Sequence, residues 1–317
     1  MSALFGIAEN FSDQVKKLFN PSKIQTGNFI FTLHQQWTFV FIIVGLIFAS
    51  TNNYLNKDAI VCVGENDNAY YREFCFLHGG GHIPKDLQGT ISSKTQCASM
   101  REDKVKKGED RTTSYYIWLP FILATIAIIT KLPGILWKNI LERKVMEKLV
   151  LDMDQEGKKT AKRFYKVVKG GASLQSAIYN FGFAACELLN LVAILISQGI
   201  LNWLFNEEYA TYGLDVQTYS SKLLSFEEKS KNLPGLNLTE PRNPMCSLFP
   251  TEISCNVNVG SPGGGYHKVN LLCLLPNNLF YQYYFLILWW WWFTLICITC
   301  LSLLYRLVQI LLPQVGR

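Results

Sequence analysis

The sequence YYIWLP at residues 115–120 stands where a charged segment ends and a long apolar run begins. Tyrosine and tryptophan favour the headgroup layer of a membrane, because their rings are buried there while the hydroxyl or the ring NH stays hydrated. Proline is tolerated in the first turns of a helix and produces a kink when it lies deeper. The order of these residues therefore indicates the start of a membrane-spanning helix.

The composition of the whole chain also indicates a membrane protein. Its 317 residues are 49% hydrophobic and only 17% charged, and the mean hydropathy is +0.13. Soluble domains usually contain about 25% charged residues. Several apolar stretches are long enough to cross about 30 Å of hydrocarbon as helices. We expect four spans, at residues 29–55, 114–137, 177–205 and 281–308, followed by a short tail at 309–317.

The charges beside these spans predict the orientation of the chain. Residues 131–175 contain eleven basic and five acidic residues, residues 206–280 contain five and seven, and residues 56–113 contain nine of each. Cytoplasmic loops are enriched in lysine and arginine. We therefore expect a multi-pass plasma-membrane protein in which both termini and the loop 138–176 are cytoplasmic. The loops 56–113 and 206–280 are then extracellular.

The cysteines agree with this orientation, because six of the nine lie in the two predicted outer loops. These six are Cys62, Cys75, Cys97, Cys246, Cys255 and Cys273. An even number of cysteines in an oxidising compartment normally pairs, and three in each loop suggest bridges between the loops. Free thiols or a metal site are the alternative, but the ligand spacing of a zinc site is absent. Cys297 and Cys300, within the fourth span, are expected to be buried apolar side chains.

Several segments together resemble the innexin family. YYIWLP is similar to the family's YYQWVPF, and the matching residues are Tyr115, Tyr116, Trp118 and Pro120. LFPTEISC at 248–255 and LLCLLPNNLF at 271–280 are similar to the family's FPxxxxC and ALCVLPLN segments. AIVC and EFCF stand at the first-loop cysteine positions, and the fourth span begins with an aromatic run like the family's FLWFWF. The resemblance covers all four spans and both outer loops.

This resemblance implies an all-α membrane protein, a four-transmembrane-helix bundle. It carries a small disulfide-clamped extracellular cap with short β elements, and a helical cytoplasmic dome formed by residues 138–176. The implied function is that of a subunit of an oligomeric large-pore channel for ions and small metabolites, acting as a hemichannel or in a docked gap junction. The implied partners are identical or related subunits in a ring of about eight, an opposing ring on a neighbouring cell, and membrane lipids.

The family's bonding pattern implies two disulfides in this chain, Cys62–Cys273 and Cys75–Cys255. The chain departs from the family by having one further cysteine in each outer loop, Cys97 and Cys246. We predict that these two additional cysteines form a third bridge, Cys97–Cys246.

Residues 1–28 contain apolar side chains at helical spacing and therefore predict an amphipathic helix. One interpretation places this helix on the inner surface of the membrane. The interpretation implied by the resemblance folds it into the pore mouth, where the pore-lining residues are Met1, Ser2, Ala3, Leu4, Glu9 and Asp13. Rings of the two acidic side chains would then tune ion preference.

Polar residues inside the spans are rare and therefore informative. Glu187 and Asn190 lie in the third span, Lys131 lies in the second, and His34, Gln35 and Gln36 begin the first. Packing between helices is the simpler role for most of them, and a Glu187 that faces the pore or a subunit interface is the alternative. The run of four tryptophans at 289–292 covers several faces of a helix, so at least one ring is expected to face lipid.

Asn237-Leu238-Thr239 is an N-glycosylation sequon in the second outer loop. A glycan on Asn237 would stand near the rim that meets an opposing ring and would hinder docking sterically. We therefore hypothesise that the protein works at least partly as an undocked hemichannel. The alternative is that the sequon is unoccupied or points sideways.

The sequence contains no nucleophile–base pair, paired carboxylates or metal motif, so we expect neither an enzyme nor a bound metal or cofactor, and no nucleic-acid partner. The alternative function is that of a four-span adhesion or scaffold membrane protein without channel activity. The CCG motif of tetraspanins and the W…GLW…C…C arrangement of claudins are absent, which disfavours two such families.

Overall fold

A computed structural model describes residues 28–55, 59–63, 69–79, 115–138, 174–232, 243–260 and 263–311. The predicted pore-lining residues of the N-terminal segment, together with Cys97, Asn237 and residues 139–173 of the predicted dome, lie outside these ranges. Those predictions therefore remain predictions.

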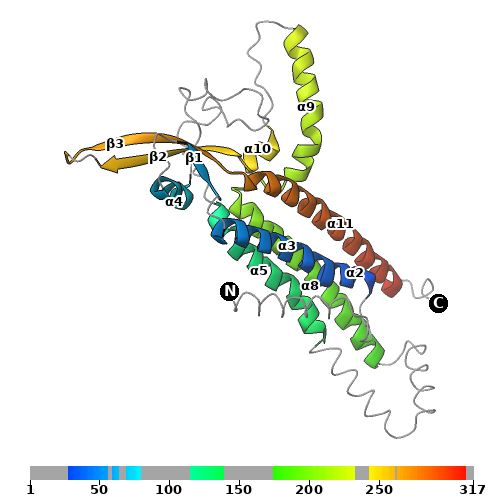
Figure 1. The fold of residues 1–317 in the computed structure, drawn as a ribbon. Helices are drawn as coiled ribbons and strands as arrows, with labels where there is room; N and C mark the ends of the chain where they lie inside the picture. The colour runs from blue at the N-terminus through cyan, green and yellow to red at the C-terminus, as the bar shows by residue number, and fades with distance from the viewer. Residues whose placement is uncertain are drawn as a thin grey trace. The chain divides into compact units, whose positions relative to one another are not determined.

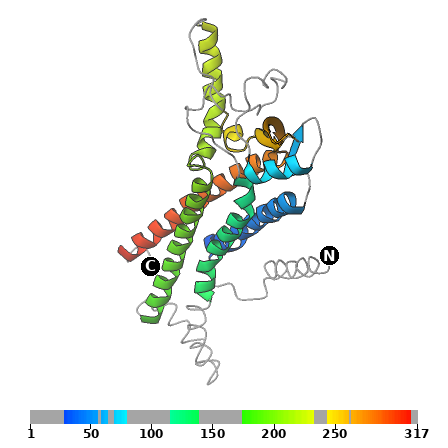
Figure 2. The same ribbon diagram turned by 90° about the vertical axis from the view of Figure 1, so that its left-hand side faces the viewer.

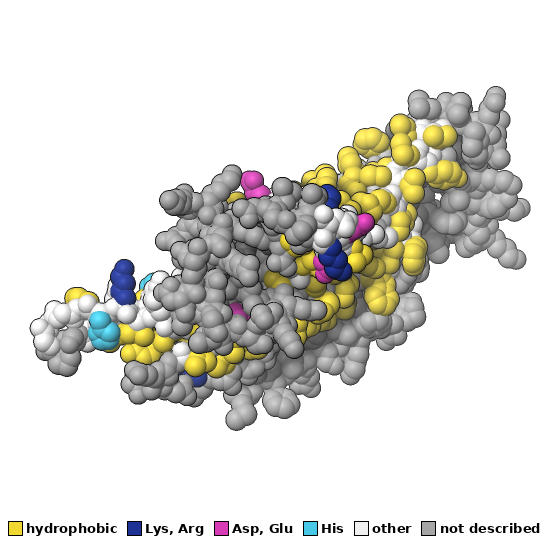
Figure 3. Space-filling view, turned by 90° about the horizontal axis from the view of Figure 1, so that it is seen from above, with side chains coloured by type: hydrophobic (Ala, Val, Ile, Leu, Met, Phe, Trp, Pro, Cys, Tyr) yellow, Lys and Arg dark blue, Asp and Glu magenta, His cyan; other side chains and the backbone are white. Residues whose placement is uncertain are grey.

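Four long apolar helical segments confirm the predicted membrane spans (Figure 1). The first, Phe29–Tyr54, comprises the α-helices α2 (Phe29–Thr32) and α3 (Thr38–Ser50) and the π-helical segments η1 (Leu33–Trp37) and η2 (Thr51–Leu55). The other three are α5 (Tyr115–Leu136), α8 (Leu174–Leu204) and α11 (Asn277–Leu311). Hydrophobic side chains dominate the visible sides of the long helices in Figure 3, which suits contact with lipid.

The fourth long helix begins earlier than the sequence pattern predicts. α11 starts at Asn277, whereas hydropathy places the span at 281–308. Pro276 directly precedes the helix, and its fixed backbone angle suits a helix start. The side chain of Asn278 donates a hydrogen bond to the carbonyl oxygen of Pro250. The polar first turn therefore belongs to the helix but not to its apolar stretch.

One compact unit contains, among the described residues, 28–41, 127–138, 174–194 and 294–311. Its apolar core consists of Phe31, Trp137, Phe183 and Cys186. The ring centroid of Phe183 lies 4.9 Å from that of Trp137, in an edge-to-face arrangement, and 5.7 Å from that of Phe31. Such aromatic pairs contribute more than their buried area alone. The beginning of the first span, the end of α5 and the first half of α8 are packed together by these rings.

The other compact unit contains the described residues between 42 and 126 and between 195 and 293. It includes a three-stranded antiparallel sheet with the order β1 (Val61–Val63), β3 (Tyr266–Leu274), β2 (Glu252–Gly260). The register pairs Cys62 with Cys273, and the strands β2 and β3 form a long hairpin (Figure 1). Gly264 lies in the turn of this hairpin with φ +81°, a conformation that glycine adopts at little cost. The sheet provides the β elements expected in the cap.

Three helices lie in the predicted outer loops, where the sequence analysis did not expect them. They are α4 (Ala69–His78), α9 (Tyr212–Asn232) and α10 (Pro244–Leu248). α9 has Asp215 in its first turn and Lys229 and Lys231 in its last turn, which complements the helix dipole. Figures 1 and 2 show α9 extending away from the end of α8, with its first turns near α10.

The aromatic side chains of this second unit form its densest packing. Phe249 and Phe285 are both fully buried and stack with ring centroids 5.2 Å apart. Phe205 lies edge-on to both rings, 5.1 Å from Phe249 and 5.3 Å from Phe285. The end of α8, the segment after α10 and the first part of α11 are therefore joined in one core.

Two expectations about side chains of α11 can be compared with the structure. Of the four tryptophans, Trp289 and Trp292 are buried and the two between them are partly exposed, as expected for a run that covers several helix faces. The prediction that Cys297 and Cys300 are buried is wrong, because both thiols are exposed on the helix surface. Their spacing of three residues puts them on a face of α11 that no described residue covers.

Gly45 provides a test of the packing in the second unit. A methyl group at Gly45 would meet the ring and hydroxyl of Tyr284, whereas the exposed Gly199 in α8 has open space around it. We expect Gly45→Ala to lower the free energy of unfolding by about 1–3 kcal/mol through overpacking. Gly199→Ala should leave it unchanged or raise it by up to about 1 kcal/mol. Thermal unfolding of the purified protein measures both, and equal midpoints for the two variants would contradict the packing described.

Candidate functional site

Two disulfides connect segments that are far apart in the chain. Cys62–Cys273 joins β1 to β3 across a sequence separation of 211 residues, and Cys75–Cys255 joins α4 to β2 across 180. This is the pairing that the resemblance implies. The two predicted outer loops are therefore covalently clamped to one another, as the sequence analysis expects.

The third predicted bridge is described only in part. Cys246, in α10, is disulfide-bonded, and its predicted partner Cys97 lies outside the described residues. The sulfur atoms of Cys62, Cys75 and Cys273 lie within 4.8 Å of one another. All three belong to disulfides, so they are not available as thiolate ligands for a metal ion.

The motif YYIWLP lies directly beside the clamp. The hydroxyl of Tyr116 donates a 3.3 Å hydrogen bond to the carbonyl oxygen of Cys75, and the hydroxyl of Tyr115 donates a 2.8 Å bond to Oδ1 of Asn278. In turn, the side chain of Asn53 donates to the carbonyl oxygen of Tyr116 at 2.6 Å. The motif thus binds the disulfide-bonded loop, the first span and the start of α11.

The exposure of the motif residues corrects one expectation. Both tyrosines are buried within the protein, so their rings contact other residues and are not exposed to a headgroup layer as their residue type suggests. Trp118 is 60% exposed and matches the expectation for a ring at a membrane surface. Pro120 is buried at the sixth position of α5, and the helix continues through it.

Further hydrogen bonds attach the second loop to α11. The side-chain amide of Gln282 donates to the carbonyl oxygen of Phe249 at 2.9 Å, and the backbone carbonyl oxygen of Gln282 accepts a 3.0 Å bond from the hydroxyl of Tyr212. The hydroxyl of Tyr209 donates to the carbonyl oxygen of Phe285 at 3.3 Å. Burial raises the pKa of both tyrosines well above its ordinary value, so their hydroxyls remain donors.

The other compact unit contains a network of buried polar side chains around Glu187, which is 1% exposed. The side chain of Asn28 donates a 2.6 Å hydrogen bond to its Oε1, and Nε of Arg306 lies 2.8 Å from its Oε2 in an ion pair. The sequence pattern singles out Glu187 as a polar residue within a span but does not indicate either partner. Arg306 is the single cation of α11, and a lone cation near the end of an apolar span is a signal that could have indicated a buried acidic partner.

The other polar residues that the sequence places within the spans also form contacts inside this unit. His34 bonds Thr299 at 2.7 Å. The side-chain amide of Gln35 donates to Asn190 at 2.6 Å, and the backbone carbonyl oxygen of Gln35 accepts a 2.6 Å bond from Lys131. Gln36 is partly exposed. Because these residues pair with other spans of the same chain, the contacts favour the packing role over a pore-facing one.

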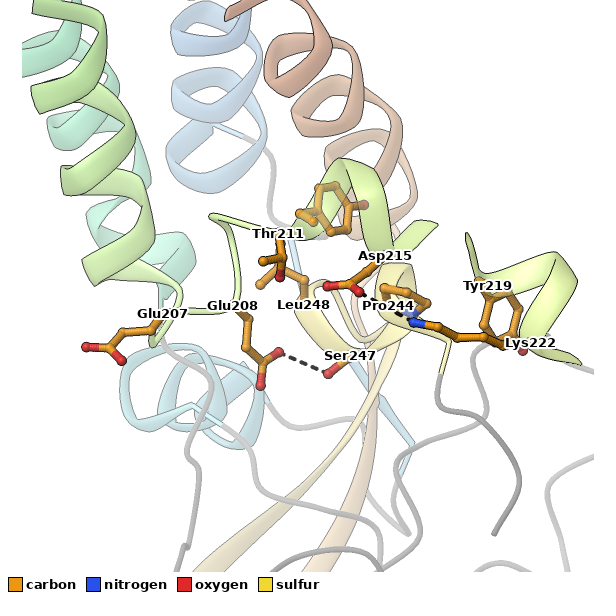
Figure 4. Close-up of a pocket in the computed structure, with 10 residues that line it drawn as sticks. Glu207, Glu208, Thr211, Asp215, Tyr219, Lys222, Pro244, Ser247 and Leu248 are labelled. Atoms are coloured by element: carbon orange, nitrogen blue, oxygen red, sulfur yellow. Dashed lines mark hydrogen bonds and ion pairs between the residues drawn. The ribbon is translucent and has the colours of Figure 1, made fainter. Parts of the chain in front are cut away.

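A cavity of about 300 Å³ lies between the start of α9 and α10 (Figure 4). Three acidic residues and one basic residue line it, and most of these charges already have partners. Glu208 accepts a 3.0 Å hydrogen bond from Ser247, and Asp215 forms an ion pair with Lys222 at 3.7 Å. The geometry of this cavity therefore assigns no ligand.

Comparisons with known proteins agree with the sequence motifs. A family model described as Innexin matches residues 27–317. The chain is 26% identical to Innexin inx2 of Schistocerca americana over 95% of this chain and 81% of that protein. It is 24% identical to Innexin inx3 of Drosophila melanogaster over 98% of this chain and 76% of that protein, and 27% identical to Innexin inx4 of the same species over 90% and 75%.

The hydrogen bond of Tyr115 can be tested against that of Tyr54. Tyr115→Phe leaves Oδ1 of the buried Asn278 without this donor and should lower the free energy of unfolding by about 1–3 kcal/mol. Tyr54 also donates to a carbonyl oxygen, but it is 50% exposed, so Tyr54→Phe should cost about 0.5 kcal/mol or less. Chemical denaturation of the wild type and the two purified variants measures these free energies of unfolding. Equal decreases for Tyr115→Phe and Tyr54→Phe would argue against a structural role of the motif.

Glu252 at the start of β2 predicts a pH dependence of stability. It is buried, its Oε2 has no hydrogen-bond partner among the described residues, and burial raises the pKa of its carboxyl above the ordinary 4.5. Because the folded state holds the proton more tightly than the unfolded state, stability should fall as pH rises from 4.5 through the folded pKa. Glu252→Gln should be more stable than the wild type at neutral pH and equal to it below pH 4.5.

The matched control for Glu252 is Glu228→Gln, at an exposed position of α9. It should change stability little at any pH. Thermal midpoints measured from acid to neutral pH compare the three proteins. A wild type and a Glu252→Gln variant with parallel pH profiles would show that this carboxyl does not titrate differently in the folded state.

Proposed function

This chain belongs to the innexin family, and we propose that it is a subunit of an oligomeric large-pore channel of the plasma membrane. The match of the family model to residues 27–317 carries the proposal, together with four membrane-spanning helices. The permeants are ions and small metabolites, and identical or related subunits form a ring of about eight. The charge distribution beside the spans supports cytoplasmic termini and extracellular disulfides.

The disulfide-clamped cap suits a rim around such a pore. Cys62–Cys273 and Cys75–Cys255 fix the two outer loops to one another. Tyr116 fastens the first loop to α5, and Tyr115 joins α5 to the start of α11. A ring of subunits needs rims of constant shape if neighbouring subunits are to match around a closed symmetry. Disulfide-linked loops keep a constant shape better than unlinked loops do, because the disulfides restrict them to few conformations.

Docking with an opposing ring is the finer part of the proposal. The sequon at Asn237 supports a protein that works at least partly as an undocked hemichannel, because a bulky glycan attached near the rim would oppose close contact. Removal of the glycan should then permit junctions between cells. The N-terminal segment, with Glu9 and Asp13, remains the proposed lining of the pore mouth.

Paired-cell recording tests this function. Cells that express the protein should show large single-cell currents and little junctional current, and Asn237→Gln should raise the junctional current several-fold. Asn237→Gln removes the sequon without changing the predicted rim elsewhere. Thr239→Ala, which removes the same sequon at another residue, is the matched control and should act alike.

Each outcome of the recording has a separate meaning. Strong junctional current in the glycosylated wild type would defeat the idea that the glycan blocks docking, while leaving the channel intact. Absence of both currents, with the protein detected at the cell surface, would contradict the channel function itself.

A further inference from the structure

The carboxylate of Glu187 in α8 holds partners from two other spans. We propose that Glu187 is the centre of an intramembrane latch that fastens Asn28, at the start of the first span, to Arg306, near the end of the fourth. We infer that this latch breaks when the pore changes between its closed and open states. The second statement rests on the proposed channel function, whereas the first rests on the contacts alone.

Asn28 performs two tasks that require an acceptor and a donor in one side chain. Its Oδ1 accepts a 2.8 Å bond from the backbone NH of Phe31 and so caps α2, while its Nδ2 donates a 2.6 Å bond to Glu187. Aspartate caps a helix equally well, but it has no donor and would repel the carboxylate. The cap residue of the first span is therefore matched to Glu187 and not only to its own helix.

Arg306 provides the charge that makes a buried carboxylate tolerable. Its Nε lies 2.8 Å from Oε2 of Glu187, its Nη2 donates a 3.3 Å bond to Oε1, and its guanidinium lies 4.9 Å from the ring centre of Phe183. The side chain of Arg306 is 27% exposed, but that of Glu187 is only 1% exposed. Arginine can therefore leave the site toward the interface, whereas the carboxylate left behind would be uncompensated.

The start of the first span is built so that it depends on these side-chain contacts. α2 has only four residues and is followed at once by the π-helical segment η1, in which backbone bonds are less favourable than in an α-helix. Gln35 in η1 is held by Asn190 and Lys131 from two other helices. Release of Asn28 would therefore free a short helical piece and would not require a long helix to bend.

A buried ion pair is a poor device for stability alone. Well-packed apolar residues of similar volume often stabilise a protein as much or more, and ionised groups within membrane spans are costly. Glu187 lies six residues past the start of the third span at Phe181, which is about 9 Å along the helix axis. A pair at that depth with one partly exposed partner suits an interaction that is made and broken.

A cysteine beside the latch reports whether it is closed, without any channel measurement. Cys186 is free, 3% exposed, and packs with Phe31, Trp137 and Phe183. In a Cys297→Ala/Cys300→Ala background, we would measure the rate at which N-ethylmaleimide alkylates Cys186 in the full chain in lipid nanodiscs. Glu187→Gln and Arg306→Gln should each raise this rate about tenfold or more, because loss of the pair admits water to the cluster.

Two further variants separate the latch from a general loss of fold. Asn28→Asp retains the helix cap but replaces the hydrogen bond to Glu187 by repulsion between two carboxylates, so it should also raise the labelling rate. Lys222→Gln breaks the exposed ion pair with Asp215 and should leave the labelling rate unchanged. The double variant Glu187→Gln/Arg306→Gln should label no faster than the faster single variant. Unchanged labelling in all variants, or additive effects in the double variant, would overturn the latch.

Whole-cell recording of the same variants tests the link to the pore. Glu187→Gln and Arg306→Gln should each change the ratio of open to closed channels about tenfold, with unitary current unchanged. Faster labelling with an unchanged ratio would overturn the role in gating. If the variants label as expected but the wild type and the variants carry no current, the latch is supported and the proposed channel function is refuted.

Discussion

The covalent clamp between the two predicted outer loops is the constraint on which the rest of the second unit depends. Its disulfides join cysteines 211 and 180 residues apart in the chain. Each bridge restricts the unfolded chain, and the lost conformational entropy of the unfolded state stabilises the folded state by about 5 kcal/mol for a loop of that length. Tyr115 and Tyr116 place their hydroxyls on the segments that the clamp holds. The sheet, α4 and the start of α11 acquire fixed positions within that unit because the clamp limits their alternatives.

The need to satisfy polar groups governs both units. Lipid offers no hydrogen-bond partners, so polar side chains in spans must find them inside the protein. In one unit, Gln282 and Tyr212 bond to backbone carbonyls near the clamp. In the other, Glu187 collects Asn28 and Arg306. The same requirement that gives the cap its hydrogen bonds thus gives the other unit an ion pair between a buried carboxylate and a partly exposed arginine.

The sequence predicted those features that depend on composition or local pattern. Apolar length predicted the four spans, and cysteine number with family motifs predicted the two disulfides between loops. α9 was missed because its residues show no apolar stripe that a helix would bury, and its end charges are a weak signal. Arg306 was missed as the partner of Glu187 because the two residues are 119 positions apart, and only packing of the spans brings them together. The exposure of Cys297 likewise depends on how α11 is turned.

The central claim is that this four-span, disulfide-clamped chain forms a pore of large diameter. Single-channel recording from the purified protein in planar lipid bilayers tests it most directly, with a bulky organic cation as the only permeant on one side. A large pore should give discrete unitary currents that the organic cation carries and that disappear when the protein is omitted. An inserted, oligomeric protein that passes no current, or passes inorganic ions while excluding the organic cation, would contradict it.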